Sequence, residues 1–422
     1  MASIILSFVG QQDPFAKTET EGSIVTLVRH LLATQHTLKR VFLLHTDSTR
    51  QNAIDTQQWL ASEVTTLTQD AIELIPVSDA FSDDPVSPLL ATQEARQAVE
   101  RARVYQAAED VLEFNASSGT PAMKTAWSVL QALGYASVHS HVWQIRNPKE
   151  MRPRQARVFY ADVNMLKEEL DLKIIRQQVQ DYNYSGALVT LRASNLYLPL
   201  IQSLLNYGYY RLSMDFNAAF SCLGAAAQDI EPQWVQEISA LRQKETRALL
   251  QEVYFNLLVR LKNRKYADFL VGLFNLQEQV LYFLVREKIG LNVSGKPAQK
   301  AQSWQVIQQA EQGKLHQFLQ NYRLPKGDLL DLNRPISRYV LQAIVEFYPQ
   351  FSGTIPLIKE LNQYCELRND AVHGFIGVSE IEDEVKLLST LRKLMKQVTG
   401  IPDVNSFDRL NHQLCGLLNR TP

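Results

Sequence analysis

Residues 3–9 read SIILSFV, and this short apolar run, followed by the polar segment GQQDPF, decides the fold of the N-terminal part of the chain. A continuous apolar run of this length is typical of a strand that is buried on both faces. Downstream of the polar segment, the stretch from Ser23 to about Lys39 has the periodicity of an amphipathic helix. A buried strand followed by a helix is the repeating unit of parallel sheets.

The same alternation of strand and helix continues to residue 145. Further apolar runs predict four more strands, at Val41–Thr46, Ile72–Val77, Val111–Ser117 and Ser137–Ile145. Helical stretches separate them: one ends near Trp59, and the others cover about Pro88–Asp110 and Pro121–Leu133. We therefore expect an α/β, Rossmann-like domain with a parallel sheet over residues 1–145, followed by a proline- and arginine-rich linker over residues 146–157.

Strand patterns almost disappear after the expected linker. From Val158 onward, apolar residues recur at intervals of three and four, as in ALLQEVYFNLLVRL (248–261), which is typical of amphipathic helices. The length of this region favours two all-α parts, a helical connecting unit over residues 158–233 and a second helical domain over residues 234–422. No internal repeat is apparent in the sequence.

Composition limits the classes of function. The net charge of −1 over 422 residues disfavours a protein that coats nucleic acid without regard to sequence, although it permits a local basic site. The three cysteines form no CxxC pair, and no HExxH motif is present, so no metal site is expected. The N-terminal sequence lacks a basic segment, and no apolar run reaches the ~20 residues of a membrane span. We expect a cytoplasmic protein without a membrane partner.

A Rossmann-like domain raises the question of a dinucleotide cofactor. Its glycines are too far apart to form GxGxxG or GxxxxGK; they are Gly10, Gly22, Gly119 and Gly134. Since close backbone approach to a pyrophosphate depends on such glycines, the sequence disfavours a nucleotide-cofactor enzyme, and no cofactor is expected.

Two polar loops lie where ligands of parallel sheets bind, at the carboxyl ends of strands. The residues that we expect to face a ligand there are Gly10, Gln11 and Gln12 after the first strand, and Asn115, Ser117, Ser118, Gly119 and Thr120 after the fourth. Thr120 and Pro121 suit the start of a helix, whose free N–H groups attract phosphate. The alternative is that these residues only cap the helix and make a turn, and the residues themselves leave both possibilities open.

The N-terminal third resembles a known family of sensor domains. The strings SFVGQQDPF, LLHT and NASSGTPAM are similar to those of the CRISPR-associated Rossmann-fold (CARF) domain found in ancillary ribonucleases of type III CRISPR systems. The resemblance implies a homodimer that binds a cyclic oligoadenylate across its two-fold axis, against Asn115 and Thr120. The family includes members that also cut the bound ring, a property that the loop sequence does not decide.

The string RNDAVHG carries the chemistry of the C-terminal part. Asn369 and His373 are four residues apart and share one helix face, so the amide can orient the imidazole. Arg368 lies about 140° around the helix from His373, and the two converge more naturally if two copies of the helix face each other. Arginine and histidine together can cleave RNA without metal, leaving a 2′,3′-cyclic phosphate. The alternative is a surface arginine paired with Asp370 and an interface histidine.

This string resembles the R-(N/H)-x-x-x-H signature of the higher-eukaryote-and-prokaryote nucleotide-binding (HEPN) ribonucleases. The resemblance implies that Arg368, Asn369 and His373 are catalytic at a site between two protomers, with single-stranded RNA as substrate. A CARF domain followed by a HEPN domain predicts a metal-independent endoribonuclease that cyclic tetra- or hexa-adenylate activates in antiviral defence. The competing hypothesis is a non-catalytic sensor or regulator, although no DNA-recognition helix is apparent after the expected linker, so DNA is not expected as a partner.

Overall fold

The computed structural model describes residues 2–16, 21–136, 139–194, 196, 198–224, 230, 232–325, 327–364, 367–369 and 377–419. The chain divides into two compact units, one comprising residues 1–173 and 194–196 and the other residues 174–193 and 197–422. We refer to them as the N-terminal unit and the C-terminal unit.

The N-terminal unit is built on a six-stranded sheet with the strand order β3-β2-β1-β4-β5-β6. The strands are β1 (Ala2–Phe8), β2 (Thr37–His45), β3 (Ile72–Pro76), β4 (Val111–Asn115), β5 (Ser140–Ile145) and β6 (Val158–Tyr160). The first five strands pair in parallel, and β6 pairs antiparallel with β5. The predicted fold class, a Rossmann-like domain followed by an all-helical region, is confirmed.

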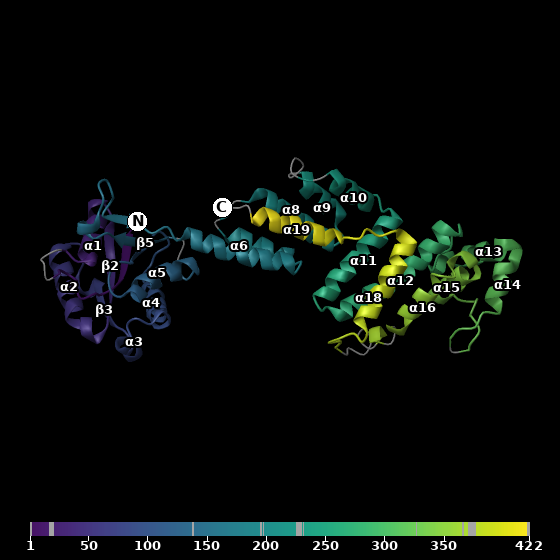
Figure 1. Cartoon of the computed structure of the whole chain (residues 1–422), viewed down its shortest axis with the longest axis horizontal. Helices are drawn as coiled ribbons and strands as arrows, with labels where there is room; N and C mark the ends of the chain where they lie inside the picture. The colour runs from purple at the N-terminus through teal and green to yellow at the C-terminus, as the bar shows by residue number, and fades with distance from the viewer. Residues whose placement is uncertain are drawn as a thin grey trace. The chain divides into compact units, whose positions relative to one another are not determined.

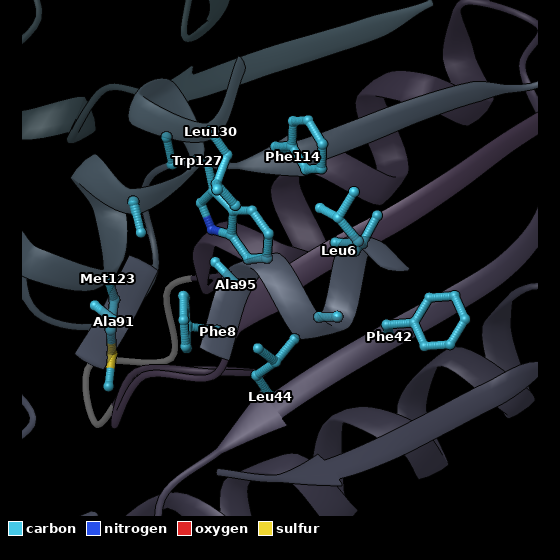
Figure 2. Close-up of a cluster of buried hydrophobic side chains, with 14 of the residues drawn as sticks. Leu6, Phe8, Phe42, Leu44, Ala91, Ala95, Phe114, Met123, Trp127 and Leu130 are labelled. Atoms are coloured by element: carbon cyan, nitrogen blue, oxygen red, sulfur yellow. The ribbon is translucent and has the colours of Figure 1, made fainter. Parts of the chain in front are cut away.

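Helices cover both faces of this sheet (Figure 1). They are α1 (Ser23–Ala33), α2 (Arg50–Glu63), α3 (Asp79–Asp83), α4 (Pro88–Arg103) and α5 (Pro121–Ala132). Alternate residues of β1 enter two separate cores: Leu6 and Phe8 pack with α4 and α5, whereas Ile5 packs with α1. Figure 2 shows the first core, in which the Trp127 ring of α5 stacks on Phe114 of β4 at a centroid distance of 5.1 Å. The largely apolar sequence of β1, in which Ser3 and Ser7 are also buried, is therefore explained by burial on both faces.

The segment after β5 differs from the prediction. The sequence pattern predicts that the helical region begins at Val158, but Val158–Tyr160 form the edge strand β6, and the Tyr160 ring stacks on Trp143 of β5. Residues 146–157 therefore connect two antiparallel strands of one sheet, with a short 3-10 helix at Pro148–Glu150. A strand of three residues gives too short a pattern for its period to be recognised.

The C-terminal unit is helical (Figure 1). Its helices are α6 (Asn164–Gln180, which begins in the N-terminal unit), α7 (Tyr184–Ala193), α8 (Pro199–Leu212), α9 (Phe216–Gly224), α10 (Pro232–Arg242), α11 (Thr246–Lys262), α12 (Tyr266–Phe283), α13 (Lys300–Gln309), α14 (Lys314–Gln320), α15 (Arg338–Phe347), α16 (Ile355–Leu361), α18 (Glu384–Thr399) and α19 (Ser406–Leu418). A π-helical turn, η4 (Leu284–Lys288), extends α12, and a 3-10 turn, η8 (Asn362–Tyr364), follows α16.

Four turns between these helices have the same backbone geometry. In each turn one residue has a φ between 55° and 59°: Tyr182, Met214, Lys244 and Arg264. Its N–H binds the carbonyl oxygen three residues earlier, and the next N–H binds the one five residues before it. This is the Schellman pattern that ends helices, and it repeats although none of the four residues at its left-handed position is a glycine. The C-terminal unit thus contains a repeated turn geometry.

Most of the expected connecting unit, residues 174–193 and 197–233, lies in the same compact unit as the helices after residue 233, whereas residues 158–173 belong to the N-terminal unit. Arg211 of α8 makes two buried hydrogen bonds to Glu252 of α11, at 2.6 and 2.7 Å, and a third to the Tyr207 hydroxyl. The Tyr184 hydroxyl of α7 donates to Asn411 of α19. Because buried charges are stable only when paired, these bonds fix α8 against α11. The domain boundary near residue 233 stays a prediction.

Candidate functional site

The loops at the carboxyl ends of β1, β2 and β4 line a pocket of about 400 Å³. β1 and β4 are neighbours in the sheet, although β2 follows β1 in sequence, so the strand order changes direction between them. The loops of such strands separate and leave a crevice at this point. The pocket therefore lies where the topology of an open parallel sheet favours ligand binding.

Seven of the eight predicted ligand-binding residues line this pocket. They are Gly10, Gln11, Gln12, Ser117, Ser118, Gly119 and Thr120. The eighth, Asn115, is fully buried behind them, where its amide donates to the Ser7 and Ser23 hydroxyls and its oxygen accepts from the Ser117 N–H. The structure thus assigns Asn115 a supporting position. Whether the pocket residues bind a ligand stays a prediction.

The residue that holds the pocket together is Asp13, which the sequence analysis did not select. Its side chain is 2% exposed and accepts hydrogen bonds from the Gly10 N–H at 3.0 Å, the Ile24 N–H at 3.2 Å and the Ser118 hydroxyl. Burial raises the pKa of Asp13, because the donors around it only partly replace water. One carboxylate therefore joins the loop after β1, the start of α1 and the loop after β4. Only its position in a polar loop after a strand could have indicated it.

Several hydroxyls of the pocket already have partners within the protein. The Ser117 oxygen accepts from the Ile145 N–H at 2.7 Å, and the Thr120 hydroxyl donates to the Pro85 carbonyl at 2.7 Å. In contrast, the N–H groups of Ser118 and Gly119 make no hydrogen bond within the described part of the chain. Free N–H groups before a helix suit a phosphate or another oxygen ligand.

The loop after β2 supplies pocket residues that the sequence analysis missed. Thr46, Ser48 and Thr49 line the same pocket, with the Thr46 hydroxyl 2.9 Å from that of Ser48 and 3.1 Å from that of Thr49. The rule that ligands bind at the carboxyl ends of strands applies to β2 as it does to β1. Lys124, in the first turns of α5, also lines the pocket. Hydroxyls, amides and one ammonium group suit a ligand with ribose hydroxyls and phosphates.

The structure describes only part of the predicted catalytic set in the C-terminal unit. Arg368 and Asn369 are helical, Arg368 half-buried and Asn369 exposed, whereas His373 lies outside the described residues. The Arg368 guanidinium donates to the Asn369 side-chain oxygen at 2.8 Å. The predicted bond from Asn369 to His373 lies outside the described residues for the same reason. The catalytic assignment of all three residues stays a prediction.

The surroundings of Arg368 are aromatic and polar. Its guanidinium carbon lies 5.1 Å from the centroid of the Phe274 ring of α12, a favourable cation–π distance. Among the described residues, several buried polar atoms on α12, in η8 and at Arg368 lack a hydrogen-bond partner: both amide atoms of Gln277, Asn362 Oδ1 and Arg368 Nε. No group of three metal-binding side chains is found in the described part of the chain. Nor is any described helix long and apolar enough for a membrane span.

The comparisons with known proteins assign the C-terminal region to a family. Residues 238–415, which include the RNDAVHG string, match the family model of the Cas_Csm6 HEPN domain. Among solved structures, the chain is similar to "Enterococcus italicus Csm6 bound to cyclic hexa-2'-fluoro-hexa-dAMP", with a TM-score of 0.69 and 16% identity over 99% of this chain and 100% of that chain. No curated protein matches the chain. Residues 238–415 thus match the Cas_Csm6 HEPN domain, and the chain as a whole shares the fold of the Enterococcus italicus Csm6 structure.

Proposed function

We propose that this chain is a homodimeric, metal-independent endoribonuclease of type III CRISPR antiviral defence, activated by a cyclic oligoadenylate and acting on single-stranded RNA. The observation that carries the proposal is the HEPN family match, because it spans Arg368, Asn369 and His373. A HEPN domain indicates ribonuclease activity, and the three residues have the chemistry that RNA cleavage needs.

The proposed reaction requires no metal ion. Imidazoles can both accept and donate a proton near neutral pH, so the His373 imidazole takes the proton of the 2′-hydroxyl or gives one to the leaving 5′-oxygen. The permanently charged Arg368 stabilises the negative charge that develops on the phosphorus. Attack of the 2′-oxygen on the adjacent phosphate breaks the bond to the 5′-oxygen, so the products carry a 2′,3′-cyclic phosphate and a 5′-hydroxyl. Asn369, which accepts a hydrogen bond from Arg368, orients the guanidinium.

The N-terminal pocket supports the proposed activation. It lies at the point of the sheet where ligands bind in this topology, and the structurally similar Csm6 is bound to a cyclic hexa-adenylate analogue. The free N–H groups of Ser118 and Gly119, together with Lys124, suit its phosphates. By the family resemblance, two such pockets face one ring across a dimer axis. Both cyclic tetra- and hexa-adenylate are candidates, and cleavage of the ring by the pocket is a further possibility to measure.

The test combines purified protein with a fluorescent single-stranded RNA and either cyclic tetra-adenylate, cyclic hexa-adenylate or no activator, in the presence of EDTA. We expect activator-dependent cleavage that survives EDTA and is abolished in His373→Ala, while activator binding is retained. The 5′-hydroxyl ends should accept phosphate from polynucleotide kinase without prior dephosphorylation. Equal cleavage by wild type and His373→Ala would refute the catalytic assignment. Activator binding without cleavage by the wild type would favour the non-catalytic sensor.

A further inference from the structure

Two guanidinium groups share the Phe274 ring. The Arg338 guanidinium carbon lies 4.6 Å from the ring centroid, and that of Arg368 lies 5.1 Å from it. The two carbons are therefore at most about 10 Å apart. Arg338 is the first residue of α15, and Arg368 belongs to the motif 30 residues later, so nothing in the sequence joins them.

The secondary structure fixes this arrangement. α15 packs against α12, which carries Phe274, and the Ser337 side chain caps the start of α15 by accepting from the Val340 N–H. On the motif side, Asn362 of η8 donates to Gln342 of α15 at 3.2 Å. Since Gln342 lies one turn beyond Arg338, this bond holds the chain that leads into the motif beside the same face of α15. Side chains held by helices in this way are suited to position a ligand.

The electrostatics of the arrangement favour an anion. Both guanidiniums are permanently charged, and the negative face of the Phe274 ring attracts each of them. Within the described part of the chain, Arg368 forms no ion pair with a carboxylate; its hydrogen bond goes to the neutral amide of Asn369. An RNA backbone carries a phosphate on each nucleotide, and the fork of a guanidinium binds phosphate oxygens in two places.

We propose that Arg338 is a second phosphate-binding residue of the ribonuclease site, and that Phe274 is the positioning residue that aims both guanidiniums at one RNA strand. Arg368 faces the phosphate that reacts, and Arg338 binds a neighbouring phosphate. The inference rests on the proposed function, because it takes the RNDAVHG string as the RNA site.

The test separates binding from cleavage. Binding of fluorescent single-stranded RNA is measured by anisotropy at several salt concentrations in His373→Ala protein, with and without Arg338→Gln. The matched control is Arg334→Gln, which removes an equal charge from an exposed arginine that pairs with Asp331. We expect Arg338→Gln to weaken RNA binding about tenfold and to reduce the slope of log affinity against log salt by about 0.7, the value for one lost phosphate contact. Arg334→Gln should leave both quantities unchanged.

Phe274 is tested through cleavage by the activated protein. We expect Phe274→Leu to lower kcat about tenfold with little change in KM, since the loss of the ring frees Arg368. Phe274→Tyr, which keeps the ring, should retain the wild-type kcat. Arg338→Lys covers the case in which Arg338→Gln is unstable, because it keeps the charge but lacks the fork, and an intermediate affinity is expected.

The outcomes distinguish the inference from the proposed function. If Arg338→Gln and Arg334→Gln give the same affinity and the same salt slope, Arg338 does not bind RNA. If Phe274→Leu retains the wild-type kcat, Phe274 does not position Arg368. Either result, obtained with a wild type that cleaves RNA, overturns the inference and leaves the proposed function intact. A wild type that cleaves no RNA under any activator fails the proposed function, and the binding series still decides the role of Arg338.

Discussion

Two regions of the molecule differ in how completely their polar side chains are hydrogen-bonded. One is the pocket of the N-terminal unit, and the other is the region near Arg368 in the C-terminal unit. In the pocket, the side chains of Asp13, Ser117 and Thr120 all make hydrogen bonds with neighbouring loops. On α12, which carries the Phe274 ring beside Arg368, neither amide atom of Gln277 has a hydrogen-bond partner among the described residues. The pocket is therefore preformed by the sheet, whereas the motif region leaves polar capacity for groups beyond its own described side chains.

The two regions also differ in the charged groups that they contain. The pocket contains one buried carboxylate and one lysine among hydroxyls, amides and backbone N–H groups. The motif region presents two guanidiniums on one ring. Neutral hydrogen-bonding groups recognise the shape and the hydroxyls of a particular ligand. Guanidiniums, in contrast, bind the phosphates of a nucleic-acid backbone whatever its sequence. This difference fits a selective receptor for a small ligand and a permissive site for RNA, in line with the proposed function.

The largest effect should come from removing the charge of the motif. We expect Arg368→Ala to lower the rate of RNA cleavage about 1000-fold or more, because the charge on the phosphorane is no longer stabilised. Activator binding, measured by calorimetry on the full chain, should stay at the wild-type affinity, because the variant alters only the C-terminal unit. A parallel loss of activator binding would show that the two regions are not separable in this way.

The converse variant alters the pocket alone. A Cβ atom added at Gly10 would lie 2.9 Å from the Gly119 nitrogen, so Gly10→Ala displaces a free N–H group of the pocket. We expect activator affinity to fall about 100-fold, or about 2.7 kcal/mol. Gly134→Asn is the control, because that position has open space and a φ of 74° that asparagine tolerates. Unchanged affinity in Gly10→Ala would place the ligand elsewhere on the N-terminal unit.

The unsatisfied amide of Gln277 can be tested by measuring the free energy of unfolding. Gln277 is fully buried on α12, and neither amide atom has a hydrogen-bond partner within the described residues. We expect Gln277→Met, of similar volume, to raise the free energy of unfolding by about 1 kcal/mol, since an unsatisfied amide is no longer desolvated. The full chain is unfolded with a chemical denaturant, and hydrogen exchange reports the unfolding of the C-terminal unit. A destabilised variant would mean that the amide has a partner in the native protein.

The smallest expected effect is on the pH dependence of stability, through two buried carboxylates of the N-terminal unit. Burial raises the pKa of Asp13 above its usual 3.8. Burial acts in the same direction on Glu113 of β4, but hydrogen bonds from His141 and Trp143 outweigh it and hold the pKa of Glu113 below its usual 4.5. The contribution of Asp13 to stability is complete below pH 3.8 and is lost as the pH rises through its folded pKa. That of Glu113 is complete above pH 4.5 and is lost as the pH falls through its folded pKa.

The two variants Asp13→Asn and Glu113→Gln should therefore show opposite pH trends. Relative to Asp13→Asn, the wild type should lose stability as the pH rises above about 4; relative to Glu113→Gln, it should lose stability as the pH falls below about 4.5. Hydrogen exchange of β1 and β4 in the full chain between pH 3.5 and 7 provides the measurement. Trends of the same sign in both comparisons would contradict the assignment.

Much of the N-terminal unit could be predicted because its signals are local. Strands buried on both faces leave uninterrupted apolar runs, and Thr120 followed by Pro121 marks the start of α5. The topology rule then placed two of the three loops of the pocket. The role of Asp13 could not be predicted in this way, because its partners Ser118 and Ile24 are distant in sequence.

The C-terminal unit shows the opposite balance. Its helices follow from their periodicity, but their turns do not, because the left-handed positions carry residues such as Tyr182 and Arg264 in place of glycine. The resemblance to HEPN ribonucleases could be recognised from the RNDAVHG string. The position of Arg338 and Arg368 against the same Phe274 ring could not be predicted from the sequence.

The sequence by itself determined the order of strands and helices, the two polar loops after β1 and β4, and the motif at Arg368, because each is a pattern within a few consecutive residues. Only the tertiary structure decided that β6 forms an edge of the sheet, that Asp13 joins three segments, and that two arginines lie against the Phe274 ring. The physical reason is the range of the interactions: periodicity reports which face of an element is buried, but the partner that covers that face is chosen by packing between distant parts of the chain.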